Sequence, residues 1–326
     1  MKAVVFYKYG GPEVLSLQEV DKPALRDREV RIRIYATTVS AGDCRVRSLT
    51  PPPMFRIPMR FMLGFNRPRN PILGIKLAGE IEAAGSKVTR FRKGDPVFGP
   101  TGFRFGAYAE YICLPENSPL AIKPSNLTYA EAAAVPVGGL TALGFLRKAC
   151  IQPGQKVLVY GASGSLGTYA VQLSKHFGAE VTAVCSSANL ELVKSLGADH
   201  VIDYAKEDFA ARGETYHIIF DTVGKTSFEA CIRMLKEHGS YVMAVMSLKP
   251  VLRGVWTSMT SSKKVISGMA GERTEDLDYL RTLIEKGKLK PVIDRSYPLE
   301  QMAEAHRYVD TGRKKGNVVI TINDNQ

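Results

Sequence analysis

The sequence has no apolar stretch long enough to cross a bilayer, and its N-terminus becomes polar too quickly for a secretory signal. It also lacks internal repeats and low-complexity tracts. Its 326 residues are enough for two domains with separate cores. With 45% hydrophobic and 23% charged residues, the composition is that of an ordinary soluble protein, and we expect it to be cytoplasmic.

Cysteine and histidine are scarce and show no spacing typical of a metal site or a catalytic triad. The cysteines are Cys44, Cys113, Cys150, Cys185 and Cys231. The histidines are His176, His200, His217, His238 and His306. An odd number of scattered cysteines fits reduced thiols in a reducing compartment, and the histidines lie inside segments that read as regular structure. We therefore interpret both sets as structural.

Acidic residues are outnumbered, with 32 Asp and Glu against 44 Lys and Arg, and the net charge is +12. This balance permits contact with nucleic acid, an anionic membrane or a polyanionic ligand, but it is also typical of a soluble surface. The basic residues are spread along the chain, with local clusters at residues 56–69 and 313–315. Aromatic and basic residues do not interleave as in an RNA-recognition motif, so nucleic acid is not a favoured partner.

One stretch of the chain predicts a strand, a glycine-rich turn and a helix in direct succession. Residues 156–160 form a short apolar run rich in β-branched side chains, which is typical of a buried strand. Beyond the turn, apolar residues repeat at helical spacing on one face, at Leu166, Ala170, Leu173 and Phe177. Gly178 then supplies a left-handed stop for the helix.

The turn itself matches the dinucleotide fingerprint. Ala162, Gly164 and Gly167 hold its three positions, with Ala162 in place of the first glycine. Gly164 lets the backbone come close to a pyrophosphate, and Gly167 permits tight packing of helix on strand. The helix then offers free N–H groups to the phosphates, so Ser165 and Leu166 join the expected cofactor site.

The rest of the chain predicts an α/β fold with two kinds of domain. The first 120 or so residues carry strand candidates at residues 2–7, 30–36, 77–84, 97–98 and 107–113. From residue 124 strands alternate with helices, at residues 156–160, 181–184, 201–202, 217–220, 240–245 and 264–267. This alternation predicts a Rossmann doubly wound parallel sheet. The expected domains are residues 1–123, 124–270 and 271–326, the last of which returns to the first.

Residues 49–74 are rich in proline, methionine, phenylalanine and arginine and are too proline-broken for one long helix. Their large apolar side chains are Phe55, Met59, Phe61, Met62 and Phe65. These side chains fit an adaptable wall over a substrate and, equally well, a small satellite core or an oligomer contact.

The tip of the second strand of the parallel sheet favours NADPH over NADH. An Asp or Glu about 20 residues beyond the loop would take the ribose hydroxyl of NAD. This tip carries Ser186, Ser187 and Asn189 instead, and no acid. These side chains can donate hydrogen bonds to a 2′-phosphate, and Tyr204, after the third strand, is placed to reach the same group.

Taken together, these motifs resemble the medium-chain dehydrogenase/reductase superfamily, and most closely its zinc-free quinone oxidoreductase branch. The resemblance rests on 77-LAGE-80 with Gly85, 94-GDPVFG-99, the Ala-x-Gly-x-x-Gly turn, 196-LGAD-199 and 221-DTVG-224, in that order. It implies a GroES-like catalytic domain beside the Rossmann domain, an active site in the cleft and a homodimer across the edge of the Rossmann sheet. By position in the family, the cofactor site also includes Ser40, Thr141, Thr222, Val223, Met246, Met269 and Asn317.

In the zinc-dependent members of the family, the catalytic zinc is held by cysteine and histidine. Those places fall on Ser40, Ile75 and Val137 in this chain, and none is a usual zinc ligand. The cysteine-rich lobe for structural zinc is missing as well. The resemblance therefore implies no zinc and a hydride transfer from the cofactor to an electron-poor acceptor, either a quinone or an α,β-unsaturated carbonyl.

Lys76 departs from the family pattern, since zinc-free relatives commonly carry an acid there. Its ammonium is expected either to pair with Asp43 or to stabilise the oxygen of an enolate or hydroquinone as charge develops, and the structural pair is favoured. Arg45 and Arg47 follow on the same segment, at the cleft edge in relatives. No residue is identified as a proton donor.

Two alternatives stay open. The first is a reductase of enoyl thioesters, because the cluster at residues 56–69 would attract the phosphates of CoA or a carrier protein. The second is a cofactor-binding protein whose main role is contact with RNA or a membrane surface, which the basic balance permits.

Overall fold

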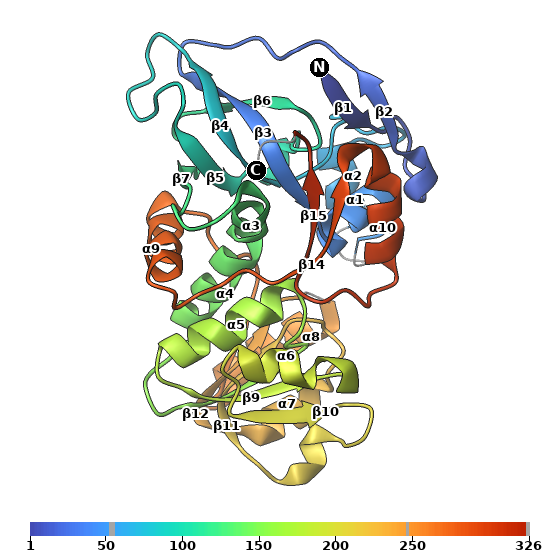
Figure 1. Ribbon diagram of the computed structural model, residues 1–326. Helices are drawn as coiled ribbons and strands as arrows, with labels where there is room; N and C mark the ends of the chain where they lie inside the picture. Colours follow the sequence, from blue (N-terminus) through green and yellow to red (C-terminus); the bar gives the residue numbers. More distant parts are fainter. Residues whose placement is uncertain (52–55, 246–247, 324–326) are drawn as a thin grey trace. The chain divides into compact units, whose positions relative to one another are not determined.

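The chain divides into two units, each built around its own β-sheet (Figure 1). The computed structural model describes residues 1–51, 56–245 and 248–323. Unit 1 contains residues 1–51, 56–137 and 272–323, and unit 2 contains residues 138–271. The chain thus enters unit 2 once and returns to unit 1 for its last part.

The first boundary differs from the sequence expectation, which set it at residue 124, whereas the structure sets it after Val137. The difference comes from helix α3 (Tyr129–Ala134), which packs on strands β3 (Glu29–Val39) and β4 (Lys76–Ala84) of unit 1. Three consecutive alanines of α3 are fully buried there. A helix that buries its apolar face on a sheet belongs with that sheet.

Unit 2 is the parallel sheet that the alternating pattern predicts. Its strands are β8 (Lys156–Tyr160), β9 (Glu180–Cys185), β10 (His200–Asp203), β11 (Tyr216–Asp221), β12 (Leu235–Met243) and β13 (Lys264–Ser267). All are parallel, in the order β10-β9-β8-β11-β12-β13. The order reverses direction at β8, which makes the carboxyl end of β8 the topological switch point where such sheets bind ligands.

The helices of unit 2 cover this sheet. They are α4 (Pro136–Lys148), which begins at the unit boundary, α5 (Ser165–His176), α6 (Leu190–Ser195), α7 (Phe228–Met234) and α8 (Leu248–Thr260). Helix α5 lies on β8 and β9, and α8 lies on the edge strand β13. Gly178 has φ +80° after the end of α5, which confirms the left-handed stop that the sequence predicts.

Unit 1 is built around a mixed, mostly antiparallel sheet. Its remaining strands are β5 (Pro96–Pro100), β6 (Tyr111–Pro115), β7 (Ala121–Ile122), β14 (Ile293–Pro298) and β15 (Asn317–Thr321). They follow the order β14-β15-β3-β4-β5-β7, with β6 paired to β3. Strands β1 (Lys2–Val5) and β2 (Ser16–Glu19) form a separate antiparallel pair. The C-terminal strand β15 lies beside β3, which explains why the chain has to return.

The helices of unit 1 frame the core beside this sheet. They are α1 (Ala41–Ser48), α2 (Arg56–Leu63), α9 (Thr274–Glu285) and α10 (Met302–Asp310), in addition to α3. Helices α1 and α10 contact each other, although more than 250 residues separate them in the sequence. Within the described residues, no helix is long and apolar enough to pass through a bilayer.

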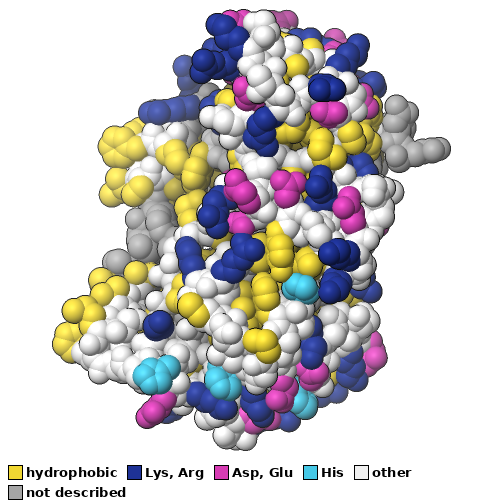
Figure 2. All heavy atoms as spheres, turned by 90° about the vertical axis from the view of Figure 1, so that its left-hand side faces the viewer, with side chains coloured by type: hydrophobic (Ala, Val, Ile, Leu, Met, Phe, Trp, Pro, Cys, Tyr) yellow, Lys and Arg dark blue, Asp and Glu magenta, His cyan; other side chains and the backbone are white. Residues whose placement is uncertain are grey.

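Basic side chains are distributed over the face of the molecule shown in Figure 2 and are interleaved there with acidic ones. On this face the excess of Lys and Arg does not form one continuous field. Nucleic-acid binding usually leaves a basic stripe or patch as its electrostatic footprint, which this face does not show.

Candidate functional site

The glycine-rich turn lies at the switch point of the unit 2 sheet. Gly161, with φ +78°, ends strand β8, and its carbonyl accepts the N–H of Gly164 at 3.1 Å. Gly164 is the N-cap of α5, and a glycine has no side chain to cap the helix. The N–H groups of the first turn of α5 therefore face the loop, where an anionic group can accept them.

Gly167 sets how closely α5 approaches the strand. A Cβ at position 167 would lie 2.2 Å from the carbonyl oxygen of Gly161 and 2.7 Å from the carbonyl carbon of Ala162. No side chain fits such a gap. A Cβ on Gly164, in contrast, would meet only the Gly161 oxygen, at an ordinary 3.5 Å. The space beside Gly164 is therefore open for a ligand rather than filled by protein.

The neighbouring strand β11 closes the other side of the turn. The hydroxyl of Thr222 donates to the carbonyl oxygens of Tyr160 and Gly161, at 2.9 and 3.2 Å. A Cβ on Gly161 would lie 2.3 Å from Cγ2 of Val223, so this side chain rests directly on the glycine. The structure thus brings Thr222 and Val223 to the loop, and their contact with the cofactor stays a prediction.

At the tip of β9, Asn189 is buried and joins the tip to the loop. Its Nδ2 donates to the hydroxyls of Ser163 and Ser186, at 3.0 and 3.2 Å. Its Oδ1 is buried and has no hydrogen-bond partner among the described residues. Buried acceptors without a hydrogen-bond partner are rare in folded proteins, and this one fits a site in which a polar ligand supplies the missing donor.

Asp203 is the residue that sequence reasoning missed at this tip. The Ser187 hydroxyl donates to Oδ2 of Asp203, and the Ala205 N–H donates to Oδ1 at 3.0 Å. These hydrogen bonds hold the pKa of the Asp203 carboxyl below its usual range. Asp203 is the last residue of β10 and pairs with Cys185 of β9 in the parallel register. The fold therefore places an acid beside the tip of β9, although the residues of that tip include none.

The other expected cofactor residues are more scattered. Thr141 is half-buried on α4, while Tyr204 and Met269 are exposed in unit 2. Ser40 and Asn317 belong to unit 1, and Met246 lies outside the described residues. The Asn317 side chain is buried at the start of β15, and its Nδ2 donates to the Val292 carbonyl at 3.2 Å.

In unit 1, Ser40 and Asp43 form the capping box that begins helix α1. The N–H and the hydroxyl of Ser40 donate to Oδ2 of Asp43, at 2.9 and 2.5 Å. Oδ1 of Asp43 is buried and has no partner among the described residues. Burial raises the pKa of Asp43, while the nearby Lys76 ammonium and the Ser40 hydrogen bonds act in the opposite direction.

Lys76 is buried at the start of β4. Burial lowers its pKa, and the negative charge of Asp43 opposes that shift, yet the described residues form no ion pair with the Lys76 ammonium. A second lysine shares this environment: burial, and then repulsion by Lys76, lowers the pKa of Lys314 to about 8. The Lys314 ammonium donates to the Gly316 carbonyl at 2.8 Å. No motif in the sequence links Lys314 to Lys76, so only the fold shows that they are neighbours.

The side chains at the three family zinc positions do not fit zinc. The hydroxyl of Ser40 is already donated to Asp43, Ile75 packs against the unit 1 core, and Val137 is apolar. In the described part of the chain, no group of three or more His, Cys, Asp and Glu side chains is arranged to hold a metal ion. Zinc sites are built from thiolates, imidazoles and carboxylates, and none is present at these positions.

Arg45 and Arg47 differ in their surroundings. Arg45 is exposed on α1. Arg47 is buried, and its guanidinium contacts the Asp310 carboxylate at 2.8 Å and Nδ1 of His306 at 2.9 Å. Burial and the Arg47 charge lower the pKa of His306 to about 3, so this histidine is neutral and accepts from Arg47. These contacts tie α1 to α10, which makes the role of Arg47 in this unit structural.

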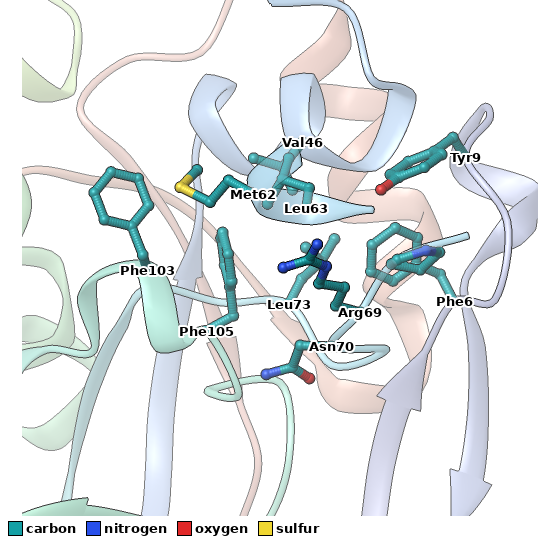
Figure 3. A pocket seen from close by; sticks show the side chains of 11 residues that line it. Phe6, Tyr9, Val46, Met62, Leu63, Arg69, Asn70, Leu73, Phe103 and Phe105 are labelled. Carbon is teal, nitrogen blue, oxygen red and sulfur yellow. The ribbon is translucent and has the colours of Figure 1, made fainter. Parts of the chain in front are cut away.

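A small pocket of about 110 Å³ lies in unit 1, beside α1 and α2 (Figure 3). Its walls are largely aromatic and aliphatic, and Figure 3 shows the Arg69 side chain between Phe105 and Phe6. Met62 lines the pocket, as the sequence interpretation of an apolar wall requires. Met59 instead packs against the unit 1 core, Phe61 and Phe65 are exposed, and Phe55 lies outside the described residues.

Two family models match the chain. The Alcohol dehydrogenase GroES-like domain matches residues 26–124, and the model described as Zinc-binding dehydrogenase matches residues 196–320. The first lies within unit 1, and the second covers the later strands of unit 2 and the return to unit 1.

Curated relatives match over almost the whole chain. The 2-methylene-furan-3-one reductase of Solanum lycopersicum is 35% identical over 98% of this chain and 79% of the relative. The chloroplastic NADPH-dependent alkenal/one oxidoreductase of Arabidopsis thaliana is 32% identical over the same shares. The quinone oxidoreductase of Pseudomonas aeruginosa is 32% identical over 98% of this chain and 99% of its own length.

Solved structures agree with these relatives. The quinone oxidoreductase from Coxiella burnetii is 29% identical, with a TM-score of 0.88 over 99% of both chains. The Escherichia coli quinone oxidoreductase complexed with NADPH is 26% identical, with a TM-score of 0.82 over 98% of this chain and all of the other.

We predict that Gly164→Ala weakens dinucleotide binding while leaving the fold intact. The new methyl group has room in the protein, but it occupies the space beside the first turn of α5. The Kd for NADPH, measured by isothermal titration calorimetry, should rise at least tenfold, which is about 1.4 kcal/mol. Gly271→Ala is the control, since no atom lies within 4 Å of that Cβ. An unchanged Kd in Gly164→Ala would show that the ligand does not approach this glycine.

We predict that His306 makes unit 1 sensitive to acid. The unfolded chain protonates its histidine below the usual pKa of 6.5, whereas folded His306 stays neutral down to about 3. Stability is therefore lost as the pH falls below about 6.5, by up to about 1.4 kcal/mol per pH unit. His306→Gln should reduce this slope in urea unfolding followed by circular dichroism, while the surface variant His200→Gln should keep it. Equal slopes in all three proteins would contradict the prediction.

Proposed function

The chain belongs to the quinone oxidoreductase branch of the medium-chain dehydrogenase/reductase superfamily, and we propose on this premise that it is an NADPH-dependent reductase of quinones and α,β-unsaturated carbonyls. The observation that carries the proposal is the open turn at Gly164, at the switch point of the unit 2 sheet. The names of three relatives describe activity on a furanone, on alkenals and alkenones, and on quinones, which supports this acceptor class.

The residues of unit 2 hold the cofactor in this proposal. The backbone N–H groups in the first turn of α5, at Ser165, Leu166 and Gly167, bind the pyrophosphate. Thr222 and Val223 contact the part of the cofactor nearest β11. Bound NADPH supplies the hydride. Thr141, Met246, Met269, Ser40 and Asn317 complete the proposed cofactor set by their position in the family.

The preference for NADPH is also part of the proposal. Ser186 and Tyr204 supply the donors for the 2′-phosphate. Asn189 positions Ser186, because its Nδ2 already donates to the hydroxyls of Ser163 and Ser186. Hydrogen bonds from Ser187 and Ala205 lower the pKa of Asp203 and so favour its negative charge, and in this proposal Lys206, 4.0 Å from Oδ2, offsets that charge near the phosphate. We place Ser187 in the site as the residue that keeps Asp203 turned toward its own loop.

We propose that the reaction proceeds without zinc, since the side chains at the three family positions are a capped hydroxyl and two aliphatic groups. A cytosolic location also remains part of the proposal and is supported by five free cysteines. A homodimer across an edge of the unit 2 sheet remains a proposal as well.

Lys76 and Asp43 are the proposed catalytic pair of unit 1, with Arg45 at the exposed end of the same segment. The Lys76 ammonium is buried and forms no ion pair with any residue that the structure describes, so it is available to a developing oxyanion, where low polarity strengthens its effect. Asp43 keeps a compensating negative charge nearby, because buried charges need partners. The structural alternative, in which Lys76 only balances Asp43, is separated from this role by experiment.

We predict that the protein oxidises NADPH only when an acceptor of the proposed class is present. A photometric screen with a benzoquinone, an aliphatic enone, an aldehyde and crotonyl-CoA should give kcat/KM at least tenfold higher for the quinone or enone than for crotonyl-CoA. NADH in place of NADPH should be at least tenfold poorer, and 1,10-phenanthroline should have no effect.

Each alternative has its own outcome in the same screen. Preferred turnover of crotonyl-CoA would favour an enoyl-thioester reductase and overturn the acceptor class. NADPH binding without turnover of any acceptor, together with a gel shift of RNA near physiological salt, would favour a binding protein. Inhibition by the chelator would contradict zinc independence.

We predict that Lys76→Met lowers kcat/KM for the enone by about 10²–10³-fold, because it removes charge stabilisation of the developing oxyanion. The Kd for NADPH should stay unchanged, since the turn that binds it lies in unit 2. Lys87→Met is the matched control, because Lys87 is an exposed lysine of unit 1 in an ion pair with Asp27. Wild-type kcat/KM with a lower melting temperature would show that Lys76 has only a structural role.

A further inference from the structure

Helix α8 of unit 2 exposes four large apolar side chains. Leu252 is 62% exposed, Val255 56%, Trp256 71% and Met259 80%. The spacing i, i+3, i+4, i+7 places all four on one face of the helix, which we call the α8 stripe. In Figure 2, hydrophobic side chains of unit 2 gather at the lower left margin. A contiguous exposed stripe of this kind marks an interaction surface.

The opposite face fixes the orientation of the helix. Val251 packs against the unit 2 core. A Cβ on Gly254 would lie 2.6 Å from Cγ1 of Val265, and the Ser258 hydroxyl accepts the Val265 N–H at 2.9 Å. Residues 251, 254 and 258 therefore hold α8 against strand β13. The α8 stripe faces away from the sheet and cannot turn inward without breaking these contacts.

A groove of about 490 Å³ between α7 and α8 extends the apolar surface. Phe228 and Ile232 of α7 face Leu252 and Trp256 of α8 across it. The groove is large enough for part of an acyl chain, since ligand pockets begin at about 300 Å³.

The charged residues of the segment that contains the α8 stripe have one sign. Residues 238–271 contain no Asp or Glu, and Lys249, Arg253, Lys263 and Lys264 are their Lys and Arg residues. Lys249 and Lys264 are exposed. Arg253 pairs with Glu229, and Lys263 donates to the Ile232 carbonyl at 2.6 Å. The exposed lysines leave an apolar helix face with positive charge at both of its ends.

We propose that helix α8 docks the α8 stripe on a membrane surface that carries anionic lipids. An amphipathic helix with Trp and aliphatic residues on one face and Lys or Arg beside it lies in the headgroup region of such a surface. Trp256 supplies the amphipathic ring that favours the interface, and Lys249 and Lys264 contact the headgroup charges.

A second copy of the chain fits this surface less well. A symmetric contact through the α8 stripe would bring the same lysines of both copies together, and Glu229, the acid that lines the neighbouring groove, is already paired with Arg253. Like charges brought together at an interface are costly, whereas anionic headgroups neutralise them. The proposal is also independent of the proposed activity, because the α8 stripe contains none of the cofactor or catalytic residues.

The experiment uses Trp256, which is the one tryptophan of the chain. The full protein is titrated with vesicles of phosphatidylcholine alone and of phosphatidylcholine mixed with phosphatidylserine. We expect a blue shift of tryptophan emission and protection from acrylamide with the mixed vesicles, and no shift with phosphatidylcholine alone. The double variant Lys249→Gln/Lys264→Gln should bind the mixed vesicles about thirtyfold more weakly.

Two further variants separate docking from misfolding. Leu252→Gln/Met259→Gln keeps the fluorophore and should lose vesicle binding at least tenfold, and Tyr7→Ala, at an exposed aromatic of unit 1, should bind like the wild type. Both should oxidise NADPH with a water-soluble acceptor at the wild-type rate. Equal binding to both vesicle types, no binding to either, or acrylamide protection that grows with protein concentration without vesicles would overturn the proposal.

Discussion

The close approach of helix α5 to strand β8 is the constraint on which the cofactor side of this protein depends. With 2.2 Å between a Cβ at position 167 and the Gly161 oxygen, only glycine allows the helix to start directly over the strand. The first turn of α5 then opens at the point where the sheet reverses its order. Parallel strands end on one edge, so the tip of β9 and the Thr222 segment after β11 arrive at the same place without any motif of their own.

In unit 1 the important groups are buried charged side chains, whereas in unit 2 they are the backbone N–H groups at the start of α5. Arg47 is satisfied by Asp310 and by neutral His306, and this cluster joins α1 to α10. Asp43 and Lys76 are less completely paired, since the described residues form no ion pair with the Lys76 ammonium, whereas Arg47 has a carboxylate partner. Each cluster also keeps one buried atom without a partner among the described residues, Oδ1 of Asp43 and Nε2 of His306. Buried charge with incomplete pairing is costly for stability, and sites of this kind are where function is expected. The contrast between the two clusters separates a structural role for Arg47 from the role proposed for Lys76.

The sequence predicts the elements whose signal is local. The bounds of β8 and β13 agree residue for residue with the structure, because short β-branched runs between turns are unambiguous. The boundary expected at residue 124 differs from the structural one after Val137, because the strands on which α3 packs are known only from the folded sheet. Asp203 and Lys314 were missed for the same reason: each reaches its site through strand register or packing with distant residues. The apolar residues on the exposed face of α8 have the same spacing as those of a helix that packs on a core. The sequence pattern therefore does not show that this face is exposed, and only the fold does.

Lys76 is consistent with the other side chains around it. The hydroxyl of Ser40 is turned to Asp43, and Ile75 packs into the core, so the positions used for zinc elsewhere in the family provide no ligand set here. Lys76 places positive charge next to these positions, and in the proposed mechanism it supplies electrostatic stabilisation of a developing oxyanion. Burial raises the pKa of Asp43 and lowers that of Lys76, and the charge of each opposes the shift of the other. The lysine and the aspartate thus depend on each other, and a change in either alone would leave the other charge uncompensated.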